Sequence, residues 1–232
     1  MNYLHALQEV HRILLPRNYV EIGCREGKSL ALANCPSVAI DPDFEVRAEL
    51  TAPTKLYRRT SDAFFRQENL TAVLGGPFDL AFVDGMHLAE FALRDILNLE
   101  RHATAASVIV VDDVLPERMG WATRERKGKA WTGDVNKVIP FLRQQRPDLS
   151  ISVFDIELKG LAIISNLDPK NRKLQQNMAQ HEDYLRSNQA SVPRHSDLRS
   201  LIDPAPTESL TAYLRELGEV RANQGLCQEA LA

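Results

Sequence analysis

The 232-residue chain is poor in the features that mark several protein classes. Its three cysteines, Cys24, Cys35 and Cys227, form no C-x-x-C pair, which argues against a disulfide framework and a structural zinc site. No apolar run approaches the roughly 20 residues of a membrane span, and charged residues interrupt the helical pattern of residues 1–15, as no signal peptide would allow. The net charge of −3 argues against nucleic acid as the main partner. We therefore expect a cytoplasmic protein without a membrane or nucleic-acid partner.

The sequence has the composition of a globular α/β protein, with 44% hydrophobic and 25% charged residues. Its length allows one large domain with an appendage, or two small domains. Helical patterns begin near Lys28, Asp43, Asp62 and Leu88. Short apolar runs between them predict buried strands at residues 19–22, 38–40, 55–57, 78–83 and 107–111. This alternation predicts a parallel sheet with helices on both faces.

The alternation of strands and helices changes after Asp113. A polar loop at residues 116–132 carries two tryptophans and five basic residues, and Asp134 is expected to cap a helix over 135–145. Two further apolar runs, 151–156 and 161–165, are joined by so few residues that only an antiparallel hairpin fits. We therefore predict a doubly wound, seven-stranded, mostly parallel sheet that ends in an antiparallel hairpin, contained in a domain of residues 1–167.

Residues 168–232 form a helical C-terminal extension in this interpretation. We expect a helix over 169–187, a linker at 191–196, and helical stretches at 208–217 and 219–230. The extension shows no internal repeat, and we interpret it as an accessory tail or as a homodimerisation element.

The segment from Glu21 to Ser29 is the first candidate site. A strand runs into Gly23 and Gly27, and a helical pattern follows at once. Glycine at such a turn lets a ligand lie against bare backbone, and a helix N-terminus behind it offers free N–H groups. Asp41 ends the next apolar run, eighteen residues after Gly23, where a doubly wound fold holds a ribose diol.

A second candidate site follows the third strand. Ser61 or Asp62 is expected to cap the next helix. Their side-chain oxygens could also meet the edge of an adenine, with Phe64 as an apolar wall.

The fourth and fifth strands end in acidic residues. Asp84 follows the fourth strand, and Asp112 and Asp113 follow the fifth. Three carboxylates at one edge of a sheet repel each other unless a cation or a proton relieves them, and Mg²⁺ prefers such oxygen ligands. His87 lies three residues after Asp84 and is a candidate general base. Capping and solvation are the alternative roles for these side chains.

The basic loop at residues 116–132 follows the acidic pair directly. It is either a solvated surface or a lid over the site, because loops at this edge commonly carry function. If the loop is a lid, its positive charge favours an anionic acceptor such as a phosphorylated or uronic sugar.

These motifs, in this order, resemble the class I S-adenosylmethionine-dependent methyltransferases. The match runs from Glu21-x-Gly23-x-x-x-Gly27 through Asp41, Ser61-Asp62-Ala63 and Asp84-Gly85 to the terminal hairpin. The pattern of Asp84-Gly85 followed by Asp112-Asp113 is similar to the small-molecule O-methyltransferases of the macrocin and aminocoumarin sugar type, and more distantly to the catechol group. The resemblance implies that S-adenosylmethionine is bound by Glu21, Gly23, Cys24, Gly27, Ser29, Asp41, Pro42, Ser61, Asp62, Ala63, Asp84 and Gly85.

The resemblance also implies a metal site and a base. Asp84, Asp112 and Asp113 occupy the positions that bind Mg²⁺ in those families, so a divalent cation is a candidate cofactor. Sugar-type enzymes often carry a second acid where this chain has Met86, whereas His87 stands where the catechol group has a lysine base. His87 is therefore the predicted proton acceptor for methyl transfer to a hydroxyl of a sugar or another small molecule.

Three alternatives remain open. A nicotinamide-dependent oxidoreductase would need a third glycine in the first turn and a parallel last strand, and the sequence predicts neither. A catalytically silent cofactor-binding or scaffolding module is allowed by Met86. A methyltransferase that works without a metal is the third.

Overall fold

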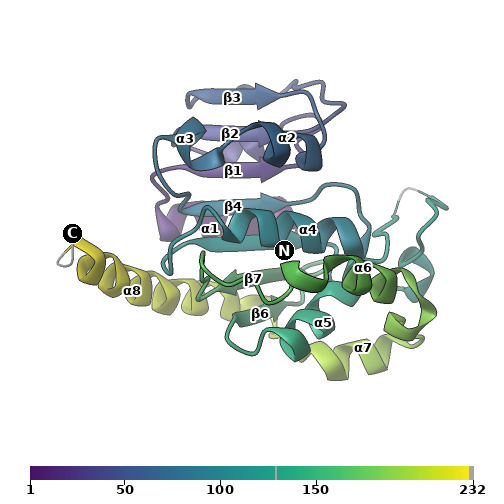
Figure 1. The fold of residues 1–232 in the computed structure, drawn as a ribbon. Coiled ribbons are helices and arrows are strands. Elements are labelled where there is room, and N and C mark those ends of the chain that lie inside the picture. The colour runs from purple at the N-terminus through teal and green to yellow at the C-terminus, as the bar shows by residue number, and fades with distance from the viewer. Residues whose placement is uncertain (129, 230–232) are drawn as a thin grey trace.

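The computed structural model describes residues 1–128 and 130–229, and its centre is a seven-stranded sheet of order β3-β2-β1-β4-β5-β7-β6 (Figure 1). Strands β1 to β5 pair in parallel, and β7 runs antiparallel to both β5 and β6. The predicted fold is confirmed, including the antiparallel hairpin. The strands are β1 Tyr19–Ile22, β2 Ser37–Ile40, β3 Thr54–Tyr57, β4 Leu80–Val83, β5 Val108–Asp112, β6 Ser150–Phe154 and β7 Leu161–Ser165.

Six helices share one hydrophobic core with the first face of the sheet. Val20, Val83 and Val111 point from the central strands into this core, and Leu93 and Ile139 meet them from two of the helices. Because parallel strands are covered on both sides, they read as continuous apolar runs rather than alternating ones. The helices are α2 Ser61–Gln67, α3 Leu70–Leu74, α4 Ala89–Glu100, α5 Val138–Gln145, α6 Met178–Arg186 and α7 His195–Ile202.

The second face is covered by α1 Tyr3–Leu14 and α8 Leu210–Glu229, from opposite ends of the chain. Leu7 and Val10 of α1 and Leu214 of α8 are fully buried there, against Phe82 and Val110 of the sheet. Both ends of the chain therefore help to build the domain that carries the site.

Two predicted helices on this face are absent from the described residues. After Gly27 the chain forms only a 3-10 turn, Leu30–Leu32, because Pro36 follows closely and favours an extended residue before it. After Asp43 the backbone is irregular: the N–H of Glu45 donates to the Arg25 carbonyl, and that of Arg47 to the Glu26 carbonyl. These bonds tie the segment to the glycine turn instead of to itself. The prediction of a helix N-terminus behind Gly27 is therefore wrong.

The C-terminal extension also differs from its predicted helices. Residues 169–174 stay irregular because the Asp168 and Asn171 side chains accept from the backbone N–H groups of Lys170 and Lys173. Helix α7 begins at His195, inside the predicted linker, since Leu198 and Ile202 bury one face of it.

Helix α8 runs without a break through Gly218, because one glycine costs a helix only about 1 kcal/mol. The predicted end at residue 230 lies outside the described residues. Helix α8 extends away from the sheet at the C-terminal end (Figure 1). Within the described ranges, no helix combines the length and the apolar character needed to cross a bilayer.

Candidate active site

A cavity of about 300 Å³ opens at the carboxyl ends of β1, β2 and β4. The chain leaves β1 toward β2 on one side and reaches β4 on the other, so the cavity lies where the strand order reverses. Ligands of doubly wound proteins bind at such a switch point. Seven residues predicted to bind the cofactor line it: Gly23, Asp41, Pro42, Ser61, Asp62, Asp84 and Gly85.

Gly23 shapes the floor of this cavity. Its φ of +89° is open mainly to glycine, and a Cβ there would meet the backbone oxygen of Asp84 at 2.1 Å. The ends of β1 and β4 can therefore approach each other only with glycine at this position.

Asp41 fixes a second wall of this cavity. Its two carboxylate oxygens accept from the backbone N–H groups of Arg25 (2.9 Å) and Asp43 (2.7 Å), so one side chain joins the turns after β1 and β2. A carboxylate has about four acceptor sites, which leaves capacity for the hydroxyls of a ribose. Asp41 therefore lies at the edge of the sheet where the sequence predicted it. Its carboxylate, and not a helix N-terminus, holds the glycine turn in place.

The third wall comes from the start of α2. Thr60, not Ser61 or Asp62, is the N-cap, and its hydroxyl accepts from Ala63 N. Ser61 and Asp62 line the cavity, and Asp62 also pairs with Arg94 of α4 (2.8 Å). Phe64 lies fully inside the core, and Phe91 of α4 takes the place expected for it in the cavity wall.

An acidic cluster with His87 lies beside the cavity. The Nδ1 of His87 contacts Asp113 Oδ2, and its Nε2 is 3.4 Å from Asp84 Oδ1. His87 and Asp113 both have left-handed backbones, with φ of +56° and +65°, a strain that clusters at functional sites. Burial and the neighbouring charge of Asp113 raise the pKa of Asp112 to about 7. Burial, followed by Asp112 and Asp113, also raises the pKa of Asp84.

Lys159 supplies a positive charge to this cluster. Its ammonium is 2.9 Å from Asp113 Oδ1. Burial favours the neutral amine, but Asp113, Asp112 and Asp84 outweigh it and raise the pKa of Lys159.

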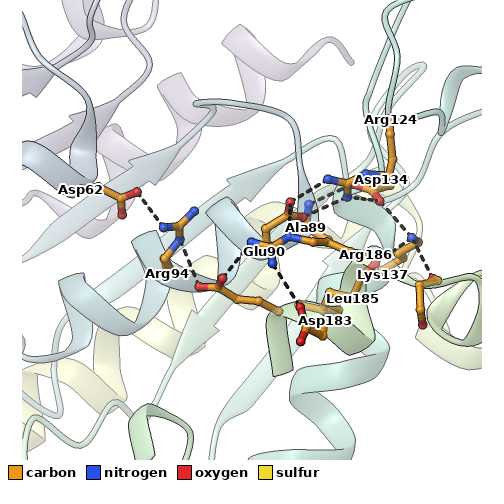
Figure 2. Close-up of polar contacts among 12 residues, drawn as sticks. Asp62, Ala89, Glu90, Arg94, Arg124, Asp134, Lys137, Asp183, Leu185 and Arg186 are labelled. Atoms are coloured by element: carbon orange, nitrogen blue, oxygen red, sulfur yellow. Dashed lines mark hydrogen bonds and ion pairs between the residues drawn. The ribbon is translucent and has the colours of Figure 1, made fainter. Parts of the chain in front are cut away.

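The basic loop is tied down beside His87 by buried acids. Arg124 pairs with Glu90 (2.6 Å) and Asp134 (2.9 Å), as Figure 2 shows. Asp134 accepts from Ala89 N at the start of α4, and its own N–H donates to the His87 carbonyl. The ring of Trp131 stacks on that of His87. The loop therefore covers His87, and its Arg124 has a structural partner.

Residues 20–114 match a family model described as a methyltransferase domain, a span that runs from β1 to the residue after Asp113. This span is similar to a methyltransferase domain. No curated protein matches the chain.

Two solved structures resemble this span and its surroundings. One is cofactor-bound Rv0187 from MTB, with a TM-score of 0.53 and 18% identity over 72% of this chain and 82% of that one. The other is the O-methyltransferase TomG from Streptomyces achromogenes, involved in tomaymycin synthesis and solved with SAM, with a TM-score of 0.52 and 17% identity over 71% and 79%. Together with the strand order, these likenesses confirm the predicted class I methyltransferase fold.

Five residues predicted to bind the cofactor lie outside the cavity lining, namely Glu21, Cys24, Gly27, Ser29 and Ala63. Glu21 is fully buried and accepts from the hydroxyls of Tyr19 (2.8 Å) and Ser29 (2.6 Å), behind the turn. Gly27 has φ of +78°, so its contribution is the shape of the turn. These residues hold the cavity wall from behind.

Three residues of the site escaped the sequence analysis. Tyr3 of α1 stacks on Phe82 of β4, and burial, followed by Asp84 and Asp112, raises the pKa of its hydroxyl to about 12. Asp95 of α4 lines the cavity, and burial raises its pKa to about 7. Lys159 could have been found, because a hairpin antiparallel to β5 returns its loop to the end of β5 where Asp113 lies.

Proposed function

We propose that this protein is an S-adenosylmethionine-dependent O-methyltransferase that acts on a hydroxyl group of a small molecule. One observation carries the proposal: Asp84, Gly85 and Met86 line both the 300 Å³ cavity and a small cavity beside His87 and Asp113. A nucleotide-type cofactor site and a base therefore share one wall.

The cavity fits the cofactor in three respects. Gly23 gives bare backbone at the floor, Asp41 offers acceptor sites for the ribose, and Ser61 and Asp62 offer polar atoms for the adenine edge. When bound, the cofactor supplies an electrophilic methyl carbon on a sulfonium. The protein's main contribution is then to align the acceptor oxygen with that carbon.

His87 and Asp113 form the proton acceptor in this proposal. In this proposal Nδ1 carries the proton and faces Asp113 Oδ2, which leaves the lone pair of Nε2, on the side of Asp84, for the acceptor hydroxyl. Trp131 stacks on His87, so it fixes the orientation of the imidazole ring and excludes water from one of its faces.

The acceptor site is proposed within the basic loop, beside the Trp131 that stacks on His87. A cavity of about 210 Å³ there is lined by Trp121, Trp131 and Lys127. Indole faces suit the apolar face of a sugar or another ring, and Lys127 suits an anionic substituent. We therefore keep an anionic small molecule or sugar as the proposed acceptor.

Calorimetric titration tests the cofactor first. S-adenosylhomocysteine should bind with micromolar affinity and NAD should not bind. Asp41→Ala should weaken that binding at least tenfold, and Glu45→Ala, an exposed acid outside the cavity, serves as its matched control. Binding of NAD alone would favour the oxidoreductase instead.

A methyl-transfer screen then tests the activity. Labelled S-adenosylmethionine is offered with sugars, nucleotide-sugars and catechols, and the wild type is compared with His87→Ala. Tight cofactor binding without transfer to any acceptor would favour the catalytically silent module.

A further inference from the structure

The acidic cluster already contains a fixed positive charge. Asp84, Asp112 and Asp113 lie at the ends of β4 and β5, and Lys159 reaches them from the loop between β6 and β7. Carboxylates this close repel one another unless a cation lies among them. A lysine ammonium is positively charged at neutral pH and can fill that role.

The hairpin holds Lys159 in place through its backbone. The Leu115 N–H donates to the Lys159 carbonyl (2.6 Å), and the Glu117 N–H donates to the Leu158 carbonyl (2.8 Å). Gly160 has φ of +66°, and a Cβ there would lie 2.4 Å from that of Leu115. The loop is therefore packed tightly onto the chain just after Asp113, and Lys159 is delivered from outside the span that matches the family model.

The residues do not suit a divalent cation as they stand. Ligand atoms of Asp84, His87 and Asp113 do lie within 4.8 Å of one another. However, Asp113 contacts His87 through one oxygen and Lys159 through the other. The adjoining cavity of about 10 Å³ holds one water at most, whereas Mg²⁺ usually keeps several.

We propose that the ammonium of Lys159 replaces a divalent cation in this cluster, so that the site works without a metal. Lys159 is then a positioning residue: it holds Asp113, and Asp113 holds His87. The consequence for catalysis rests on the proposed function, since it makes the methyl transfer independent of Mg²⁺.

Manganese binding tests this inference without any acceptor or cofactor. Free Mn²⁺ is followed by electron paramagnetic resonance during titration of the wild type, Lys159→Met and Lys159→Arg. Lys170→Met is the matched control, because it removes the same charge from an exposed position after β7, at the opposite edge of the sheet. The wild type, Lys159→Arg and Lys170→Met should bind Mn²⁺ no tighter than millimolar, and Lys159→Met should bind at least tenfold tighter.

Two results would overturn the inference. One is micromolar Mn²⁺ binding by the wild type that Asp113→Asn abolishes. The other is a folded Lys159→Met that binds Mn²⁺ no tighter than the wild type.

A measurement on the wild type covers the case in which Lys159→Met does not fold. Millimolar Mg²⁺ should leave its melting temperature unchanged, because only a ligand of the native state raises it. A rise that Asp113→Asn removes would also refute the inference. Since no assay here needs methyl transfer, failure of the cation assignment is distinguishable from failure of the proposed function.

Discussion

Two groups of acidic side chains lie near His87, and their charges are compensated very differently. Glu90 and Asp134 are both buried, and together they receive Arg124, Arg186 and Lys137 (Figure 2). The cluster of Asp84, Asp112 and Asp113 receives one lysine and one histidine. Within the described part of the chain, Asp112 Oδ1 has no hydrogen-bond partner at all.

The pKa directions follow this difference. Burial favours the neutral acid in both groups, yet Arg124 and Arg186 outweigh it and hold the pKa of Glu90 below its ordinary value. The pKa of Asp112 instead rises to about 7. A buried acid with full cationic partners stabilises structure, whereas under-compensated acids in a cleft are typical of functional sites. The first group holds the loop and α6 in place, and the second contains the proposed chemistry.

The largest expected effect is on catalysis, in Asp113→Asn. An asparagine cannot fix the proton on His87 Nδ1 as a carboxylate does, so methyl transfer should fall about 10²- to 10⁴-fold. S-adenosylhomocysteine should bind within a few-fold of wild type, because Asp113 does not line the 300 Å³ cavity. Single-turnover rates and calorimetry measure the two quantities. Asp183→Asn, an exposed acid of the α6 ion pairs, is the control, and equal rates in the two variants would contradict the prediction.

Glu21 is a third kind of buried acid, and it predicts a stability that depends on pH. Its hydrogen-bond donors, Tyr19 and Ser29, are neutral, and burial raises the pKa of Glu21 to about 7. Between pH 4.5 and 7 the folded protein therefore holds a proton that the unfolded chain has lost. Below pH 4.5 the Glu21 carboxyl makes its full contribution to the free energy of unfolding. That contribution, about 3 kcal/mol, is lost as pH rises through 7.

Urea denaturation at several pH values measures this contribution. The wild type is compared with Glu21→Gln, because Asp95 and Asp112 titrate in the same range and contribute to both proteins. The wild type should lose more stability than the variant between pH 4.5 and 7. Parallel profiles would show that the Glu21 carboxyl titrates normally.

In the group formed by Glu90 and Asp134, we predict that Glu90→Gln has a smaller effect, on stability alone. The change removes the common partner of Arg124 and Arg186, but both guanidinium groups are partly exposed and can turn to water. We expect a loss of about 2 kcal/mol in the free energy of unfolding. A double-mutant cycle with Arg124→Gln should show a coupling of about 1 kcal/mol or more, and additive losses would refute the pairing.

Much of the fold was readable because buried parallel strands leave continuous apolar runs. The helix predicted after Gly27 is cut short by the nearby Pro36, whereas the helix predicted near Asp43 was wrong for a tertiary reason. The segment after Asp43 bonds to the turn containing Arg25 and Glu26, and no local pattern announces such a partner. The missing helix cover is supplied by α1 and α8, which lie at the two ends of the sequence.

The candidate site was readable to the same extent. Gly23, Asp41 and Asp84 come together because parallel strands end at one edge, which the strand pattern alone implies. Asp95 reaches the same edge from a helix face, so its placement requires the packing of α4, whereas the predicted hairpin already implied where the Lys159 loop lies. The ion pair of Lys159 with Asp113, and with it the charge balance of the acidic cluster, emerged from the structure.

The smallest effect is predicted for an exposed ion pair with nearly the same geometry as the buried one. Arg47 lies 2.8 Å from Glu45, and Arg124 lies 2.6 Å from Glu90. The Arg47 and Glu45 side chains are 65% and 76% exposed, whereas Glu90 is 2% exposed. Water and salt screen the exposed charges, so Arg47→Gln should change the free energy of unfolding by less than about 0.5 kcal/mol. A loss in urea denaturation as large as that of Glu90→Gln would show that distance, and not burial, sets the strength of these pairs.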